Sequence, residues 1–172
     1  MRNKVRLFDQ VIAELVAKIP ASFRGYFVFA STFGTPLTWV GIHMGLVVAF
    51  VSDEANAWLA TSIIVLLFLP FSGLLKHVIR RKRPQTIYAQ NMRIKSYSFP
   101  SSHAYNAALG GGHIAALVHI SNTPFSFGIV STIILFSISV GVSRIYLGAH
   151  HPSDVLAGWI LAAGILISLF SL

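Results

Sequence analysis

The stretch SRIYLGAHHPSD, residues 143–154, decides how this sequence is interpreted. It places an arginine, two histidines and an aspartate between two apolar segments that are each long enough for a membrane helix. Charged side chains beside hydrocarbon are costly and usually mark a functional site. The stretch therefore predicts a site where two membrane-spanning helices end.

The composition supports a membrane protein. Of the 172 residues, 55% are hydrophobic and only 10% are charged, which is too apolar for an ordinary soluble domain. The chain has no cysteine, so disulfides, thiolate metal ligands and cysteine nucleophiles are excluded. Its length predicts a single membrane-embedded domain, 1–172, with an N-terminal interfacial segment at 1–34 and a helical core at 35–172.

On either side of this stretch the sequence is apolar over lengths that predict five membrane helices: 35–52, 56–76, 102–120, 126–147 and 153–172. The first residues instead show apolar side chains at helical spacing, broken by Asp9 and Glu14, which predicts an amphipathic helix in the membrane interface. A signal peptide is the alternative, but these two carboxylates interrupt its apolar region. Segment 23–34 either extends the interfacial helix or enters the membrane shallowly. The predicted fold class is all-α, an integral membrane helical bundle of about five transmembrane helices plus the N-terminal interfacial helix.

Positive charge predicts the orientation. With five spans, every lysine and arginine falls on the side that holds the N-terminus, and cytoplasmic loops carry such an excess. We therefore expect that side to face the cytoplasm. The residues are Arg2, Lys4, Arg6, Lys18, Arg24, Lys76, Arg80, Arg81, Lys82, Arg83, Arg93, Lys95 and Arg144.

KHVIRRKRP, residues 76–84, is the first of three polar clusters on that side. Pro84 disfavours helical geometry at the residue before it, so a helix is expected to end near Arg83. The spacing of Lys76, Arg80 and Arg83 would put three cations on one helical face, where they form a phosphate clamp.

FPSSH, residues 99–103, is the second cluster. Pro100 suits the start of a helix, and the two serines that follow offer hydroxyl groups. Free N–H groups in a first helical turn bind anions, and His103 would be aimed at whatever they hold. Ser101, Ser102 and His103 are therefore candidates for an anion site.

The third cluster is the opening stretch itself. Pro152 suits a first helical position, so a helix is expected to begin near it. Asp154, four residues after His150, could accept a hydrogen bond from one ring nitrogen and orient the other as a nucleophile. Arg144, at the end of the preceding span, would add another phosphate contact.

Each cluster also has a structural explanation. The basic run could stop translocation and contact lipid headgroups, a role that we expect for Arg81 and Lys82. The serines could only cap a helix, and Asp154 could only complement a helix dipole. The three clusters together describe a phosphate site without metal or cofactor, since Mg²⁺ and Ca²⁺ require several carboxylate oxygens.

These motifs resemble the signature of the type 2 phosphatidic acid phosphatase family, which shares its core with the vanadium haloperoxidases. That signature reads K-x6-RP, PSGH and SR-x5-H-x3-D. The first and third parts match in full, and the second carries Ser102 where the family has glycine. The matching positions are Lys76, Arg83, Pro84, Pro100, Ser101, His103, Ser143, Arg144, His150 and Asp154.

The resemblance implies a membrane lipid phosphatase with a phosphohistidine intermediate. His150 would attack phosphorus, Asp154 would orient it and His103 would protonate the leaving oxygen. Phosphoryl oxygens would be held by Lys76, Arg83, Arg144, Ser101 and the amide of Ser102, with Arg80 as a further candidate. The serine in place of glycine would disturb this geometry only if the position needs a positive φ.

Partners and location follow from the same resemblance. The substrate would be a lipid phosphate such as phosphatidylglycerophosphate, phosphatidic acid or a polyprenyl phosphate or diphosphate. Bacterial members have six spans and a periplasmic site, whereas five spans with a cytoplasmic N-terminus would place this site at the cytoplasmic face of the inner membrane. A non-catalytic protein that binds anionic lipid is the alternative, and a haloperoxidase would need vanadate. Nucleic acid is disfavoured, because no aromatic platform accompanies the basic residues. The oligomeric state stays open.

Overall fold

The structure is a computed structural model that describes residues 2–49, 56–92, 96–121 and 124–171. All regular elements in these ranges are helices, which confirms the predicted all-α class. The predicted loop at 51–55 and the basic residues Arg93 and Lys95 lie outside the described residues. In chain order the elements are α1 (Arg2–Ala17), the 3₁₀ turn η1 (Ala21–Phe23), α2 (Arg24–Thr32), α3 (Pro36–Ala49), α4 (Asn56–Phe68), α5 (Phe71–Ile79), α6 (Ile87–Gln90), α7 (Ser102–Ile120), α8 (Ser126–Tyr146) and α9 (Pro152–Phe170).

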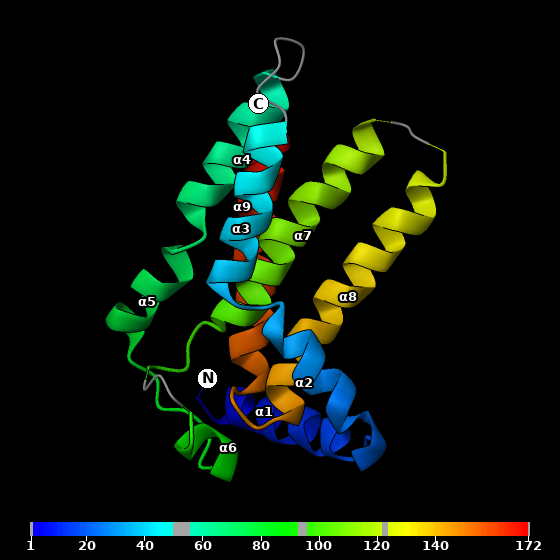
Figure 1. The fold of residues 1–172 in the computed structure, drawn as a ribbon. Coiled ribbons are helices and arrows are strands. Elements are labelled where there is room, and N and C mark those ends of the chain that lie inside the picture. Colours follow the sequence, from blue (N-terminus) through cyan, green and yellow to red (C-terminus); the bar gives the residue numbers. More distant parts are fainter. Residues whose placement is uncertain (1, 50–55, 93–95, 122–123, 172) are drawn as a thin grey trace.

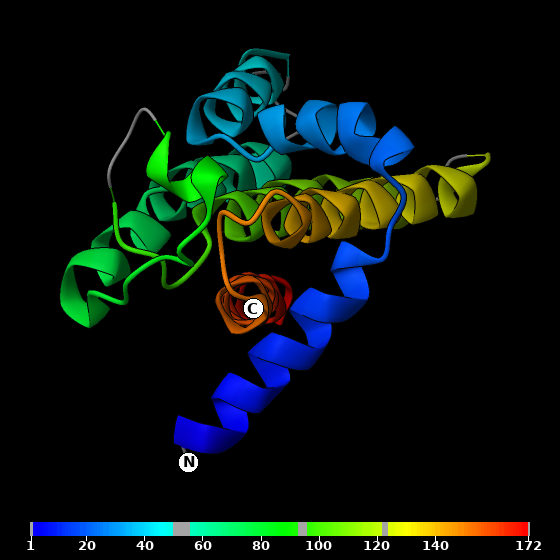
Figure 2. The same cartoon turned by 90° about the horizontal axis from the view of Figure 1, so that it is seen from below.

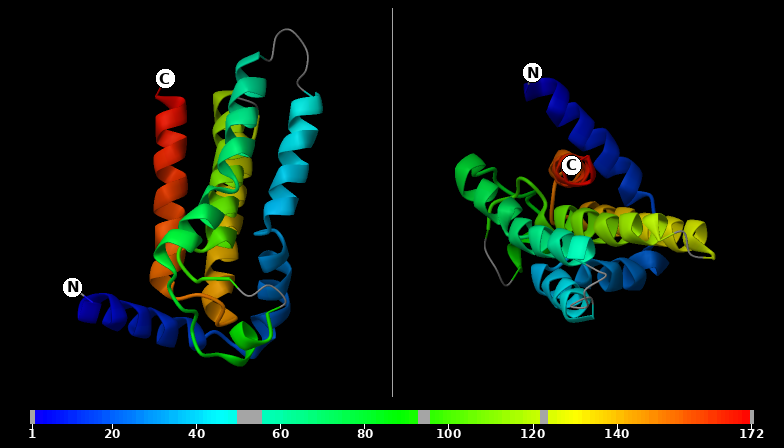
Figure 3. Two further views of the ribbon diagram at one scale, coloured as in Figure 1. Left: turned by 90° about the vertical axis from the view of Figure 1, so that its left-hand side faces the viewer. Right: turned by 90° about the horizontal axis from the view of Figure 1, so that it is seen from above.

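Helices α3, α4, α7, α8 and α9 form the bundle, and successive members run in opposite directions (Figure 1, Figure 3). Within the described residues, three helical stretches are long and apolar enough to cross a membrane: Trp58–Ile79, Ser126–Tyr146 and Pro152–Phe170. Helix α3 is apolar but shorter. The number of about five spanning helices therefore stays a prediction. The alternating directions of the five bundle helices agree with it.

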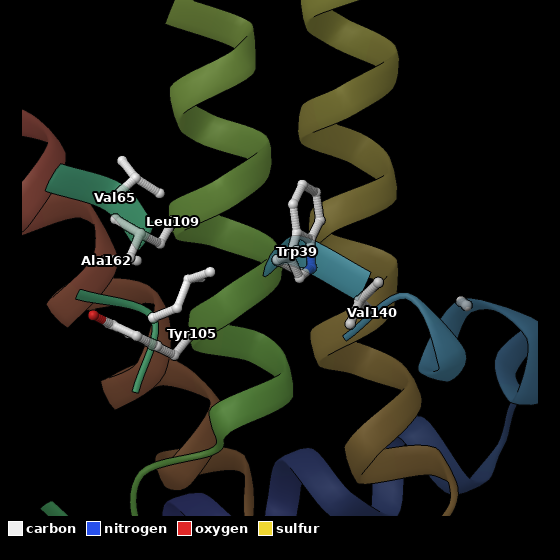
Figure 4. Close-up of a cluster of buried hydrophobic side chains, with 9 residues drawn as sticks. Trp39, Val65, Tyr105, Leu109, Val140 and Ala162 are labelled. Carbon is white, nitrogen blue, oxygen red and sulfur yellow. The ribbon is translucent and has the colours of Figure 1, made fainter. Parts of the chain in front are cut away.

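Helix α7 lies in the middle of the bundle, packed against both α8 and α9. This position explains why α7 is not among the three stretches that are apolar enough to cross a membrane, because helices rather than lipid surround it. Ala104, Tyr105, Ala107 and Leu109 are completely buried, and Figure 4 shows Tyr105 and Leu109 beside Val65 and Ala162 in the core.

The glycines of α7 allow close packing against neighbouring helices. A Cβ atom on Gly110 would lie 2.3 Å from the indole of Trp39 on α3, far inside van der Waals contact. Small residues at such positions let helices approach closely in a bilayer. The GGG run at 110–112 is therefore a packing feature and not a phosphate loop.

The predicted helix at 56–76 is divided by Pro70, which separates α4 from α5. Proline has no N–H for the helical ladder and clashes with the preceding turn, so a break at this position is expected of it. Helix α5 then continues down to the end of the bundle that carries the signature (Figure 1).

The predicted N-terminal helix forms as α1 and lies across the lower ends of α8 and α9 (Figure 2). Several of its apolar side chains are exposed, including Leu7 at 62% and Leu15 at 52%. Its exposed apolar side chains are consistent with a helix that rests in the membrane interface.

Candidate functional site

The three motifs converge at the lower end of the bundle, on the same side as α1 (Figure 1). Motif one lies on α5 and the segment after it, motif two at the start of α7, and motif three on the turn between α8 and α9. This end of the molecule buries several charged side chains. They are Asp9, Lys76, Arg144, His150 and Asp154.

His150 lies between an arginine and a carboxylate. Its Nε2 is 3.0 Å from Nη1 of Arg83, and its Nδ1 is 3.5 Å from Oδ2 of Asp154. Only 3% of the residue is exposed. The second distance is longer than a well-formed hydrogen bond, but such contacts often tighten only when a substrate is bound. One ring nitrogen thus faces the carboxylate and the other faces the cations.

The turn before α9 fixes the position of His150. The backbone carbonyl of Arg144 accepts hydrogen bonds from the amides of Ala149 and His150, at 2.9 and 3.1 Å. Gly148 has φ of 70°, which favours glycine, and its carbonyl accepts a 2.7 Å hydrogen bond from the hydroxyl of Thr86. Helix α9 then begins at Pro152, as predicted.

Asp154 is completely buried and surrounded by donors. Its Oδ1 accepts a 2.6 Å hydrogen bond from Nη1 of Arg81, and its Oδ2 accepts one from the hydroxyl of Ser98 and one of 2.9 Å from the amide of His151. Hydrogen bonds of this kind hold a carboxylate in its charged form. The carboxylate is therefore fixed in one orientation beside His150.

Lys76 and Arg83 reach the site, but not from one helical face. The expectation of a helix as far as Arg83 is wrong, because α5 ends at Ile79 and Arg80 takes a left-handed conformation with φ of 52°. The hydrogen bond from the Ser98 amide to the Arg81 carbonyl, 2.8 Å, holds the chain beyond this point against the 96–101 segment. Arg80 is exposed and its Nε donates to the His77 carbonyl, so the structure does not bring it to the signature residues.

Arg83 instead extends along the 96–97 segment. It donates to the carbonyls of Ser96 and Ala149, both at 2.8 Å, and to the hydroxyl of Ser96. Lys76 is 7% exposed and its Nζ lies 3.2 Å from the carbonyl of Tyr97. These contacts fix both cations near His150.

Arg144 is 2% exposed, at the end of α8. Its Nη1 donates to the hydroxyl of Ser31 on α2, and its guanidinium lies 5.8 Å from the ring centroid of Tyr88. Its Nε has no acceptor among the described residues. An arginine has only donors, so this buried group is suited to an anionic ligand.

The start of α7 carries the residues of the predicted anion site. Ser101 is the N-cap, with its hydroxyl 3.5 Å from the Ala104 amide, and Ser102 is the first helical residue. Among the described non-glycine residues, only Arg80 and Phe125 have positive φ. A serine at position 102 therefore meets no backbone strain. The amides of Ser102 and His103 belong to the first turn, where a helix offers no acceptor.

The electrostatics favour a neutral His150. Burial is the main cause that lowers its pKa to about 3; the contact with Asp154 acts in the opposite direction. Neighbouring cations lower the pKa further. They are Lys76, Arg83 and Arg144. A neutral imidazole keeps the lone pair that a nucleophile needs.

Two residues, Arg81 and Asp9, support the site through contacts that the sequence did not predict. Arg81 was expected to contact lipid headgroups, but its guanidinium bridges Asp154 and Asp9, at 2.6 and 2.7 Å. Asp9 was expected only to interrupt an apolar run in α1. Nothing in the local sequence pairs residues this far apart. In the part of the chain that the structure describes, no three His, Cys, Asp or Glu residues are grouped to hold a metal ion.

Comparison with known proteins identifies the family. A family model described as the PAP2 superfamily matches residues 55–172, which cover all three motifs. The chain therefore belongs to the PAP2 superfamily and is an integral membrane lipid phosphatase, a metal-independent phosphoric ester hydrolase. This confirms the family resemblance seen in the sequence.

Curated relatives carry several phosphatase names. An undecaprenyl-diphosphatase of Sulfolobus acidocaldarius is 27% identical over 84% of this chain and 68% of its own length. Phosphatidylglycerophosphatase B of Bacillus subtilis is 38% identical over 51% of this chain, and a dihydrosphingosine 1-phosphate phosphatase of Schizosaccharomyces pombe is 28% identical over 91%. The chain spans only 43% and 40% of the length of these last two proteins.

A solved structure has the same fold. The transmembrane PAP2-type phosphatidylglycerolphosphate phosphatase of Bacillus subtilis superimposes with a TM-score of 0.76, covering 98% of this chain and 86% of its own. The two sequences are 24% identical, so this likeness establishes the fold alone.

Proposed function

We propose that this chain hydrolyses a lipid phosphomonoester of the phosphatidylglycerophosphate type through a phosphohistidine on His150. The observation that carries the proposal is the position of His150, with Nε2 3.0 Å from Arg83 and Nδ1 facing the buried carboxylate of Asp154. A nucleophile held between an orienting carboxylate and a phosphate-binding cation is what phosphoryl transfer requires.

Each residue of the site has a role in the proposed reaction. Phosphoryl oxygens bind Lys76, Arg83 and Arg144, and the Arg83 donor is thereby drawn away from Nε2 of His150. That nitrogen attacks phosphorus while the bond to the lipid oxygen breaks. His103 gives its proton to the leaving oxygen, and Asp154 stabilises the charged imidazole. Water then gives a proton to the deprotonated His103 and attacks phosphorus, the bond from phosphorus to Nε2 breaks, and phosphate leaves.

The remaining polar groups of α7 complete the phosphate site. Ser101 and the first-turn amides of Ser102 and His103 would donate to phosphoryl oxygens, in a position that the helix dipole also favours. Catalysis in this scheme is chiefly positioning and charge neutralisation, with no metal required.

The substrate assignment rests on two considerations. Phosphatidylglycerophosphatase B is the relative with 38% identity, and its 93 matched residues are over half of this chain. The basic residues also gather at the end of the bundle that holds the N-terminus, which favours a cytoplasmic site. Hydrolysis of a polyprenyl diphosphate is the second candidate, because the archaeal undecaprenyl-diphosphatase matches 84% of the chain.

The test is phosphate release from a panel of lipids in detergent with EDTA. The panel holds phosphatidylglycerophosphate, phosphatidic acid, and a polyprenyl phosphate and diphosphate. We expect EDTA-resistant release, fastest from phosphatidylglycerophosphate, which falls about a thousandfold or more in His150→Ala. The matched control is His151→Ala, since His151 lies outside the signature. Full activity in His150→Ala would contradict the phosphohistidine mechanism. Lipid binding without hydrolysis would leave a non-catalytic lipid-binding protein.

Orientation has a separate test. Because the chain has no cysteine, single cysteines at Gln90 and Ser121 can be labelled without background. The two positions lie at opposite ends of the bundle (Figure 1). In intact cells we expect an impermeant reagent to label Ser121→Cys and to spare Gln90→Cys. The reverse pattern would place the site on the outer face of the membrane.

A further inference from the structure

Helix α1 lies outside the matched family region, yet it touches the site. One of its residues, Asp9, is buried to 7% exposure although several apolar neighbours on the same helix are exposed. A buried carboxylate is costly unless it is paired and hydrogen-bonded. On a helix expected to rest in lipid, a polar side chain turned toward the protein calls for a specific partner.

Asp9 has three donors, all from the site. Its Oδ2 accepts 2.7 Å from Nη2 of Arg81 and 3.0 Å from the hydroxyl of Ser153. Its Oδ1 accepts 2.7 Å from the amide of Ser153, in the first turn of α9. The helix that carries the catalytic carboxylate thus has one of its free N–H groups satisfied by α1.

Arg81 connects the two carboxylates. Its Nη2 binds Asp9 while its Nη1 binds Oδ1 of Asp154 and the hydroxyl of Ser153, at 2.6 and 2.7 Å. A guanidinium has a planar fork of donors, so fixing one arm fixes the direction of the other.

The cavity beside the nucleophile has α1 as one wall. It has a volume of about 570 Å³, and its lining includes Arg6, Asp9 and Gln10 from α1 together with Arg81 and His150. The interfacial helix therefore borders the residue proposed to carry the phosphoryl group.

We propose that α1 belongs to the catalytic apparatus, and that Asp9, acting through Arg81, is a positioning residue that fixes the carboxylate of Asp154 and with it the imidazole of His150. This rests on the proposed function, in which His150 is the nucleophile. Because α1 is expected to lie in the membrane interface, the alignment of the site would depend on how this helix is seated there.

The test compares Asp9→Asn with Glu14→Gln in the full-length protein in detergent. Asparagine keeps the shape of Asp9 and its Oδ1 acceptor for the Ser153 amide, but it loses the charged Oδ2 that accepts from Arg81 and from the Ser153 hydroxyl. Glu14 lies on the same helix, is exposed, and accepts only from Gln10 among the described residues. We expect kcat of Asp9→Asn to fall about 10- to 100-fold, because small misplacements of reacting groups have effects of this size. KM and the melting temperature should change little, and Glu14→Gln should match wild type.

Two further variants separate positioning from structural support. Asp9→Glu should recover most of the activity, since it restores the charge. The double variant Asp9→Asn/Arg81→Gln should be no slower than Arg81→Gln alone, because Asp9 acts only through that arginine. Additive losses in the double variant, or a loss of kcat that follows the melting temperature and is not rescued by glutamate, would overturn the inference.

Different experimental results would overturn the inference about α1 and the proposed function. Wild-type kcat in Asp9→Asn, with His150→Ala inactive, would remove the role of α1 and leave the phosphohistidine reaction in place. Full activity in His150→Ala would remove both.

Discussion

Helix α7 carries two histidines, His103 and His113, that differ in how many hydrogen-bond partners the fold gives their rings. His113, near its middle, closes a chain of hydrogen bonds within the bundle: its Nε2 is 3.0 Å from the Thr61 hydroxyl and its Nδ1 is 3.3 Å from Nε2 of His43, whose Nδ1 is 3.0 Å from the Trp39 carbonyl. His103, in the first turn, forms no hydrogen bond through its ring to any described residue. The first histidine is satisfied by the fold, and the second is not.

The same contrast separates the groups around each histidine. Around His113, the ring nitrogens of His113 and His43 and the Thr61 hydroxyl have partners within hydrogen-bond distance. Around His103 the cations Lys76, Arg83 and Arg144 offer only donors, and the Nε of Arg144 has no acceptor among the described residues. Asp154 is already bound to Arg81 and Ser98. Buried polar groups that satisfy one another support the structure, whereas a surplus of buried donors indicates an anionic ligand.

Replacing His103 should have the largest effect of the substitutions that test this contrast. His103→Gln removes the proposed acid, and general acid catalysis contributes about 10²- to 10⁴-fold. We expect kcat to fall by that factor in steady-state assays with a lipid phosphate. Thermal unfolding should be unchanged, since no hydrogen bond within the described structure is lost. Wild-type turnover would show that His103 is not the proton donor.

Replacing Arg83 should have the next largest effect and also shift the pH dependence. Arg83→Gln removes a phosphate contact, so kcat/KM should fall about 10- to 100-fold. The positive charge of Arg83 lowers the pKa of His150, so its loss raises that pKa. A histidine with a higher pKa is protonated, and so not nucleophilic, at higher pH; the acid limb of kcat/KM should therefore move toward neutral pH. An unmoved limb would contradict this coupling.

Arg80→Gln is the matched control for that measurement. Arg80 belongs to the same basic run but is exposed and bound to the His77 carbonyl. Its replacement should leave both kcat/KM and the acid limb unchanged. A loss comparable to that of Arg83→Gln would support the sequence-based suggestion that Arg80 contacts substrate.

A smaller loss is expected from Gly34→Ala, which disturbs His103 without touching substrate. The new Cβ would lie 2.6 Å from Cβ of His103 and 2.8 Å from Cγ1 of Val140, so the histidine must shift. We expect kcat to fall about tenfold, with a loss of about 1 to 3 kcal/mol in the free energy of unfolding. Gly41→Ala is the control, because nothing lies within 4 Å of a Cβ there. Equal kinetics of the two variants would show that His103 tolerates displacement.

The smallest catalytic effect should follow from His113→Ala. This change leaves Thr61 and His43 without their partner, which costs about 1 to 3 kcal/mol of unfolding free energy. Measured in detergent by thermal or denaturant unfolding, stability should fall while kcat stays within about twofold of wild type. A strong catalytic loss without destabilisation would connect the mid-bundle histidines to the reaction.

Local signals in the sequence predicted much of the fold. Apolar runs located α3, α7, α8 and α9, helical spacing located α1, and Pro152 marked where α9 begins. These signals succeed because propensity, capping and hydropathy act over a few residues. The end of α5 was misplaced, because contacts with the 96–101 segment, rather than Pro84, decide where that helix stops.

The sequence identified the candidate residues of the site, but not the residues that hold them in position. Spacing within each motif identified His150, Asp154 and Arg83. It could not show that Arg81 turns inward, because that requires Asp9, more than seventy positions earlier, and Asp154 at a similar distance along the chain. Pairing across such separations is set by how helices pack, and no periodicity records it.

Trapping the covalent intermediate tests the central mechanism most directly. A labelled lipid phosphate would be mixed with the protein in detergent, the reaction quenched in alkali, in which phosphohistidine survives, and the labelled peptide identified by mass spectrometry. We expect the phosphoryl group on His150 in wild type, and none in His150→Ala. Hydrolysis with no labelled histidine, or a label that remains in His150→Ala, would contradict nucleophilic attack by this residue.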